Sequence, residues 1–84
     1  MFRVSITSRA ERELKGLDRP VKNRIISVIS ALASDPRPPG CLKVKSEESV
    51  WRIRVGDWRV GYQVDDNLSE VLVVRIANRS DFYA

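Results

Sequence analysis

The sequence predicts a small α+β domain in which a strand and a helical hairpin precede a mostly antiparallel sheet of three to four strands. Three observations indicate this order. Residues 1–7 alternate between apolar and polar, residues 8–34 place apolar residues at helical spacing, and residues 41–77 contain apolar runs typical of strands. At 84 residues, without a linker, repeat or low-complexity segment, the chain is expected to form one domain, residues 1–84.

The first two elements follow from "MFRVSITSRAERELKGL". Phe2, Val4 and Ile6 fall on one side of an alternating stretch, which predicts a half-buried strand. Ser8 followed by Glu11 fits a capping box, so the first helix is expected to begin there. Its apolar stripe consists of Ala10, Leu14 and Leu17.

A second helix is predicted over residues 20–34. Pro20 suits its first turn. The apolar residues follow the spacing i, i+4, i+7, i+8, i+11, which marks one buried face: Val21, Ile25, Val28, Ile29 and Leu32. The short connection between the helices predicts an antiparallel pair, and the prolines and glycine of "SDPRPPGC" predict a loop after it.

The remaining strands are "CLKVK", a hairpin over "VWRIRV" and "WRVGYQV", and the long run "EVLVVRIA". If Gly56 and Asp57 form the hairpin loop, then Arg54 opposes Arg59 and Arg52 opposes Gly61. Alternation then gives the hairpin one apolar, core-facing side: Trp51, Ile53, Val55, Trp58, Val60 and Tyr62. The other side carries Arg52, Arg54, Arg59, Gly61 and Gln63.

This arginine-rich face is the first candidate site. Like charges across a hairpin cost stability, and no acidic residue shares this face of the two strands with the three arginines. Close-set guanidinium groups suit bidentate phosphate binding, and Gly61 is expected to leave the surface open. The face therefore predicts an anion site, with an RNA or DNA backbone as the leading candidate. A solvated sheet face, whose arginine stems cover apolar surface, is the alternative.

The tail "NRSDFYA" adds Arg79 and Tyr83. The last strand is expected to lie beside the strand of Arg59, which would bring both residues near the arginine-rich face. A tyrosine there suits either a general base, if the arginines lower its pKa, or a base-stacking platform. Packing of Phe82 and Tyr83 against the edge of the sheet is the alternative.

The composition excludes several chemistries. Fifteen Lys and Arg against eleven Asp and Glu give a net charge of +4, which favours a polyanionic partner. With no histidine and one cysteine, neither a histidine acid/base nor a familiar zinc site can be built, and no metal or cofactor is expected. Asp65, Asp66 and Glu70 are expected to belong to a solvated turn.

The cysteine content and the apolar runs indicate the compartment. Cys41 is the single cysteine, which indicates a reducing compartment. No apolar run suits a signal peptide or a membrane span, so a cytoplasmic protein without a membrane partner is expected.

The blocks "WRIRVGDWRVGYQVDD" and "VLVVRIANRSDFY" resemble the closing pattern of the RelE/ParE superfamily of toxins of bacterial type II toxin–antitoxin systems. "LKVK" and the helical hairpin fall in the same order as in that family. The resemblance implies a fold like that of microbial ribonucleases. For the RelE-like branch it implies inhibition of translation by an endoribonuclease that cleaves messenger RNA in the ribosomal A site. That reaction is a metal-independent attack of the ribose 2′-OH on the adjacent phosphate.

The resemblance also implies which residues act. Arg59, Arg79 and Tyr83 match catalytic positions, and Arg52 and Arg54 match positions that bind RNA. The best-known pattern has lysine at the last two positions, and arginine is effectively never deprotonated. Lys43 and Lys45 are therefore added as RNA-binding residues and as candidates for proton transfer. Many relatives have His-Arg where this chain has Asn78-Arg79, which leaves the acid for the leaving group unassigned.

The partners implied are a cognate acidic antitoxin in a hetero-oligomer, together with the ribosome and messenger RNA. Two other readings stay open. The ParE-like branch shares the fold but poisons DNA gyrase by protein contact, and a catalytically weak member would bind only its antitoxin or RNA. Arg79 with Tyr83 in the tail favours the RelE-like chemistry.

Overall fold

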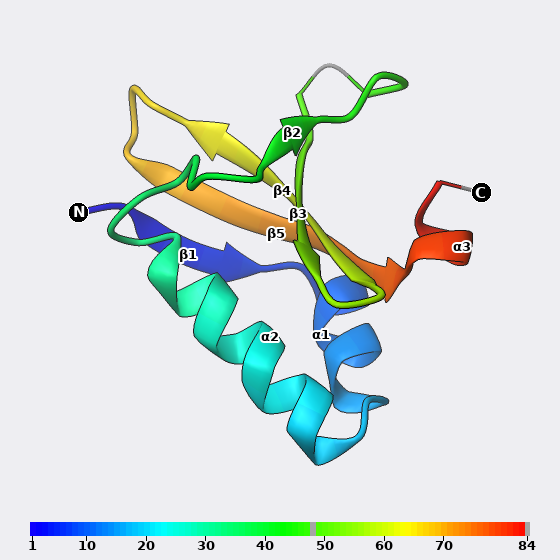
Figure 1. Ribbon diagram of the computed structural model, residues 1–84. Helices are drawn as coiled ribbons and strands as arrows, with labels where there is room; N and C mark the ends of the chain where they lie inside the picture. Colours follow the sequence, from blue (N-terminus) through cyan, green and yellow to red (C-terminus); the bar gives the residue numbers. More distant parts are fainter. Residues whose placement is uncertain (48, 84) are drawn as a thin grey trace.

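The computed structural model describes residues 1–47 and 49–83. Figure 1 shows the order of its elements and the place of the helices on the sheet. They are β1 (Arg3–Ile6), α1 (Ser8–Lys15), α2 (Arg19–Ala31), β2 (Leu42–Lys43), β3 (Trp51–Val55), β4 (Trp58–Asp65), β5 (Glu70–Asn78) and α3 (Arg79–Phe82). The predicted α+β order of strand, two helices and mostly antiparallel sheet is confirmed.

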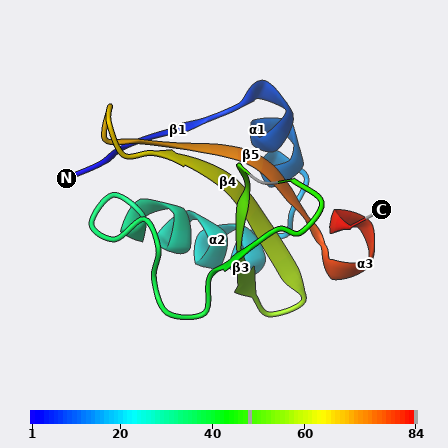
Figure 2. The ribbon, with the colours of Figure 1, turned by 90° about the horizontal axis from the view of Figure 1, so that it is seen from above.

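The strands form one five-stranded sheet in the order β1-β5-β4-β3-β2. Every neighbouring pair is antiparallel except β1 and β5, which are parallel. The first strand thus joins the same sheet as the later strands, at the edge opposite β2. Figure 2 shows β1 beside β5 and β4 beyond it, in the order of the sheet.

The first helix begins one residue earlier than the capping box predicts. Thr7, not Ser8, is the N-cap, and its hydroxyl accepts a 3.2 Å hydrogen bond from the backbone N–H of Ala10. Thr7 holds this position because its backbone is still extended at the end of β1. Glu13, one turn further on, accepts a 2.8 Å hydrogen bond from the backbone N–H of Ile76 and so ties α1 to β5.

The second helix buries the predicted face but ends at Ala31, before the expected boundary at residue 34. Ile25 and Leu32 are completely buried, and Pro20 lies in the first turn as predicted. The core face of the sheet supplies the other half of the core: Val55, Val60, Tyr62, Val71, Val73 and Ile76. Trp51 and Trp58 pack against this core and are partly exposed.

Tyr62 fixes the proline-rich loop to the sheet. Its hydroxyl donates a 2.8 Å hydrogen bond to the carbonyl oxygen of Pro36, and burial raises the pKa of the phenol well above its usual value. Arg37, the next residue of the loop, forms a two-pronged ion pair with Asp66. The loop that leads into β2 is therefore held at both the core and the surface. No helix within residues 1–47 and 49–83 is long and apolar enough to cross a lipid bilayer.

Candidate functional site

The β3–β4 hairpin has the predicted register. Arg54 lies opposite Arg59 and Arg52 lies opposite Gly61, so the four residues share the face of the sheet that points away from the core. In the next strand pair Arg75 lies opposite Gly61, which adds a fourth arginine to this outer face. The sequence alone did not single out Arg75, because the pairing of β4 with β5 shifts register between Gly61 and Tyr62.

The alternation of the hairpin predicts that Arg59 is exposed in a cluster of arginines, but in the structure Arg59 is buried. Only 6% of its surface is exposed. Its Nη1 donates hydrogen bonds to the carbonyl oxygens of Gly56 (3.2 Å) and Trp58 (3.1 Å), so the guanidinium folds back on its own hairpin turn. Its Nε is buried and has no hydrogen-bond partner among the described residues. The tight turn draws the side chain inward because it offers carbonyl acceptors next to the strand.

Gly61 does not leave the surface open either. The ring of Phe82 lies directly over it, and a Cβ atom at this position would come within 2.9 Å of the ring's Cζ. Phe82 therefore packs on the face of the sheet instead of at its edge. The glycine provides the space into which the C-terminal tail docks.

Tyr83 lies in a groove of about 310 Å³ beside β2 and β3. The groove is lined by Leu42, Lys43, Val44, Lys45, Ser46, Arg52 and Tyr83. It brings together four of the site residues predicted from the sequence, and none of the described residues lining it is acidic. The four are Lys43, Lys45, Arg52 and Tyr83. Lys45 and Arg52 beside an exposed tyrosine make this groove suitable for a phosphate that is flanked by a base or sugar, whereas the Nζ of Lys43 lies over the Trp51 ring.

A second groove, of about 240 Å³, is also lined by Tyr83. Its polar and aromatic lining consists of Arg9, Ser46, Glu47, Arg75, Phe82 and Tyr83. Arg75 donates a 3.0 Å hydrogen bond from Nη2 to the carbonyl oxygen of Asp81. Tyr83 therefore belongs both to a groove lined by three cations and to one of mixed charge.

The other arginines predicted as site residues do not line either groove. Arg54 and Arg59 pair close to the hairpin turn, and Arg79 is an exposed residue at the start of α3. The backbone N–H of Arg79 donates a 2.8 Å hydrogen bond to the carbonyl oxygen of Asp57 in that turn. The structure thus divides the candidate residues into a groove group around Tyr83 and a turn group around Gly56 and Asp57.

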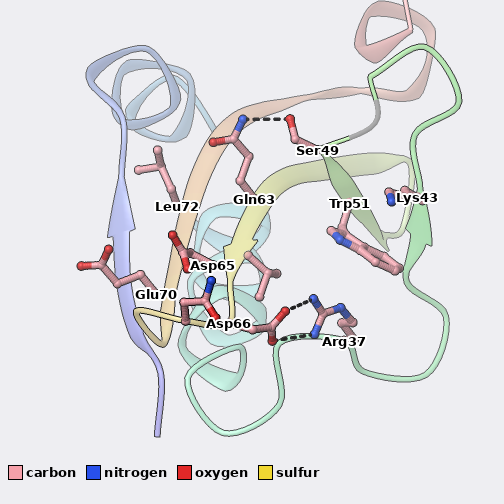
Figure 3. A pocket seen from close by; sticks show the side chains of 11 residues that line it. Arg37, Lys43, Ser49, Trp51, Gln63, Asp65, Asp66, Glu70 and Leu72 are labelled. Atoms are coloured by element: carbon pink, nitrogen blue, oxygen red, sulfur yellow. Dashed lines mark hydrogen bonds and ion pairs between the residues drawn. The ribbon is translucent and has the colours of Figure 1, made fainter.

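A wider groove surrounds Trp51, at the point where β4 continues beyond β3 (Figure 3). Arg37 lies 5.2 Å from the centre of the Trp51 ring, and Nζ of Lys43 lies 5.8 Å from it. Arg37 also binds both carboxylate oxygens of Asp66, at 3.1 and 2.8 Å. This hydrogen bonding lowers the pKa of Asp66.

Three carboxylates from the β4–β5 turn region line the Trp51 groove. Asp65 and Asp66 are exposed, as expected for a solvated turn, and Glu70 lies 3.6 Å from Arg3. Asp65 accepts a 3.0 Å hydrogen bond from the backbone N–H of Leu68, within the turn. These acids make the Trp51 groove less suited to a phosphate than the groove of Tyr83.

The fold and the groove define a small α+β protein with a basic groove beside a tyrosine near its C-terminal helix. Over residues 4–83 the chain matches the family described as ParE toxin of type II toxin–antitoxin system, parDE. It is 31% identical to Toxin RelE of Mycobacterium tuberculosis (strain ATCC 25618 / H37Rv) over 83 residues, which are 98% of this chain and 86% of that protein. The chain therefore belongs to the RelE/ParE superfamily of toxins of type II toxin–antitoxin systems.

Solved structures agree on the fold. The RelE–RelB complex from the archaeon Pyrococcus horikoshii OT3 contains a chain that superposes with a TM-score of 0.83 at 22% identity, covering 95% of this chain and 97% of that one. The isolated E. coli RelE toxin gives a TM-score of 0.80 at 22% identity, covering 99% of this chain and 92% of that one. At this identity the likeness establishes the architecture.

Proposed function

We propose that this toxin is a ribosome-dependent endoribonuclease that cleaves messenger RNA without a metal ion. The observation that carries the proposal is the groove in which Tyr83 lies beside Lys43, Lys45 and Arg52. These groups supply what cleavage by the ribose 2′-OH requires: positive charge for the phosphate, and a flat ring that can orient a nucleotide.

In the proposed reaction the 2′-oxygen attacks the adjacent phosphorus. A bond forms between O2′ and phosphorus, and the bond between phosphorus and O5′ breaks. The 2′-OH loses its proton to a base and the departing O5′ receives one, so the products are a 2′,3′-cyclic phosphate and a 5′-OH. Negative charge grows on the phosphate oxygens in the transition state, where preorganised cations are most effective.

The groove group carries the chemistry in this proposal. Arg52 binds the phosphate oxygens through its guanidinium, whose planar fork of donors suits bidentate contact. Lys45 and Lys43 add charge, and like Tyr83 they carry a group that can exchange a proton. Tyr83 stacks on the nucleotide or takes the 2′-OH proton, two roles that differ in their need for the phenolic oxygen.

The turn group binds the flanking RNA. Arg54 and Arg79 are exposed beyond the groove, where they extend the positive surface along the path of the backbone. Arg59 contributes by holding the hairpin turn to which Arg79 is attached. In solution the toxin pairs with a small acidic antitoxin, as RelE does with RelB in the complexes of its structural neighbours.

Action on DNA gyrase is the second candidate, because the family matched over residues 4–83 is described as ParE toxin. The two functions are separated by incubating the purified protein with translating ribosomes and mapping RNA ends, with gyrase supercoiling assayed in parallel. Cleavage confined to ribosome-bound messenger, leaving 2′,3′-cyclic phosphate ends, is expected. Gyrase inhibition without cleavage would overturn the nuclease proposal.

Variants locate the activity. Arg52→Ala and Tyr83→Ala are expected to reduce cleavage at least tenfold, since both residues line the groove. Arg19→Ala serves as the matched control, because Arg19 is an exposed arginine at the start of α2 and lies outside the residues lining either groove. Equal activity of all three variants would place the reaction elsewhere.

A further inference from the structure

Tyr83 follows α3, a helix of only four residues. A single helical turn does not hold itself in water, because its one or two hydrogen bonds do not offset the cost of ordering the backbone. The position of Tyr83 therefore depends on contacts that α3 makes with the sheet.

The start of α3 is fixed to the β3–β4 turn. The Asn78 side chain accepts hydrogen bonds from the backbone N–H of Ser80 at 3.2 Å and from its hydroxyl at 3.1 Å, which caps the helix. The backbone N–H of Arg79 reaches the carbonyl oxygen of Asp57. These contacts place the first residues of α3 but leave Tyr83 a full turn away.

The end of α3 is held by two residues on the outer face of the sheet, Arg75 and Gly61. Arg75 donates to the carbonyl oxygen of Asp81, two residues before Tyr83. The Phe82 ring lies over Gly61, the residue directly opposite Arg75. The rings of Phe82 and Tyr83 then meet edge to face, with centres 5.0 Å apart and planes at 80°.

We propose that Arg75 and Phe82, with Gly61 as the socket, are positioning residues that hold Tyr83 where it lines both grooves. We call Gly61, Arg75 and Phe82 the tail latch. Any side chain at Gly61 would collide with the Phe82 ring, and loss of Arg75 would free the Asp81 carbonyl. Either change releases the last turn and leaves the three cations of the Tyr83 groove in place.

The consequence for cleavage rests on the proposed function. If the latch orients Tyr83, its loss removes an interaction of the transition state and spares the binding of RNA by the cations. The maximal cleavage rate is then expected to fall at least about tenfold, and the ribosome concentration for half-maximal rate to change less than about twofold. Arg75→Lys, which keeps a cationic hydrogen-bond donor, is expected to recover part of the rate.

A spectroscopic measurement tests the latch without using cleavage. The chain contains two tyrosines, so 3-fluorotyrosine labelling gives two ¹⁹F signals. Tyr62 is completely buried and serves as the internal reference for folding, whereas 57% of Tyr83 is exposed. In Arg75→Ala, Phe82→Ala and Gly61→Ala the Tyr83 signal is expected to move toward that of the free amino acid, with the Tyr62 signal unchanged. The Arg19→Ala control should move neither.

The contact between Gly61 and the Phe82 ring allows a second test. Once Phe82 is shortened to alanine, a methyl group at Gly61 meets no ring, so the shift changes of Gly61→Ala and Phe82→Ala should be strongly non-additive in the double variant. Additive changes, or a Tyr83 signal that stays in place in Arg75→Ala and Phe82→Ala, would overturn the latch. A wild-type protein that cleaves no RNA but shows these shifts would overturn the nuclease proposal and leave the latch standing.

Discussion

Replacing Arg59 with alanine is expected to destabilise the folded protein as well as reduce its activity. The substitution removes two hydrogen bonds to the carbonyl oxygens of Gly56 and Trp58, and it removes a side chain that is 6% exposed. The turn that these bonds hold also carries the contact between Asp57 and Arg79. A loss of activity in this variant would therefore combine altered folding with altered chemistry.

The size of the effect follows from opposing terms. Hydrogen bonds from a charged donor contribute about 1.5–3 kcal/mol each. Against this, the buried Nε of Arg59 has no partner among the described residues, and Arg54 lies directly across the hairpin, so removing the charge relieves both costs. We expect a net loss of about 1–3 kcal/mol in the free energy of unfolding. This corresponds to a decrease in Tm of about 5–20 °C for a domain of this size.

Urea unfolding followed by tryptophan fluorescence measures the change, since Trp58 adjoins the turn. Arg54→Ala is the matched control, because it removes the opposing arginine from an exposed position. That variant should stay within about 0.5 kcal/mol of wild type. An Arg59→Ala protein as stable as the control would refute the reasoning and return Arg59 to a purely catalytic role.

Three further predictions concern the grooves. Tyr83→Phe keeps the ring, so retained cleavage of ribosome-bound messenger would favour stacking, and loss comparable to Tyr83→Ala would favour the hydroxyl as the proton acceptor. Arg52→Ala is expected to lower the salt dependence of binding to single-stranded RNA by about one phosphate contact, a slope change of about 0.7 in log K against log salt; an unchanged slope would place Arg52 away from the backbone. Asp66→Asn tests the ion pair with Arg37, which lowers the pKa of Asp66 and so stabilises the fold above the unfolded-state pKa of this group. The wild type should exceed Asp66→Asn in urea midpoint at neutral pH and lose that advantage as the pH falls below about 4; a constant difference would contradict the linkage.

The parts of the fold that local patterns specify could be predicted from the sequence. The alternation of Arg52 and Arg54 with apolar residues, together with the Gly56-Asp57 turn, determines the hairpin register because both signals lie within a few residues. The apolar spacing from Val21 to Leu32 determined the buried face of α2 for the same reason. The N-cap was placed one residue late because Thr7 and Ser8 are both good capping residues and only the end of β1 selects between them.

The candidate site was less predictable, because it depends on contacts between distant segments. Alternation gives the face on which Arg59 lies but not its burial, which depends on the carbonyl groups of the folded turn. The space over Gly61 is filled by Phe82, from the short helix α3 that follows β5. The register shift in β4–β5 placed Arg75 opposite Gly61, and no local pattern in β5 specifies that shift.

The repulsion expected between the two opposed arginines of the hairpin is reduced in the folded protein. Arg54 and Arg59 do lie opposite each other, but the Arg59 guanidinium is directed into the turn, where two carbonyl dipoles offset its charge. The repulsion that Arg54 experiences is smaller than two exposed arginines would produce, so a bound phosphate between them is not needed to explain the pairing. Lys43, Lys45 and Arg52 line the groove of Tyr83, and none of the described residues lining that groove is acidic. A polyanion is therefore expected to make its strongest contacts in that groove and its weaker ones at the turn.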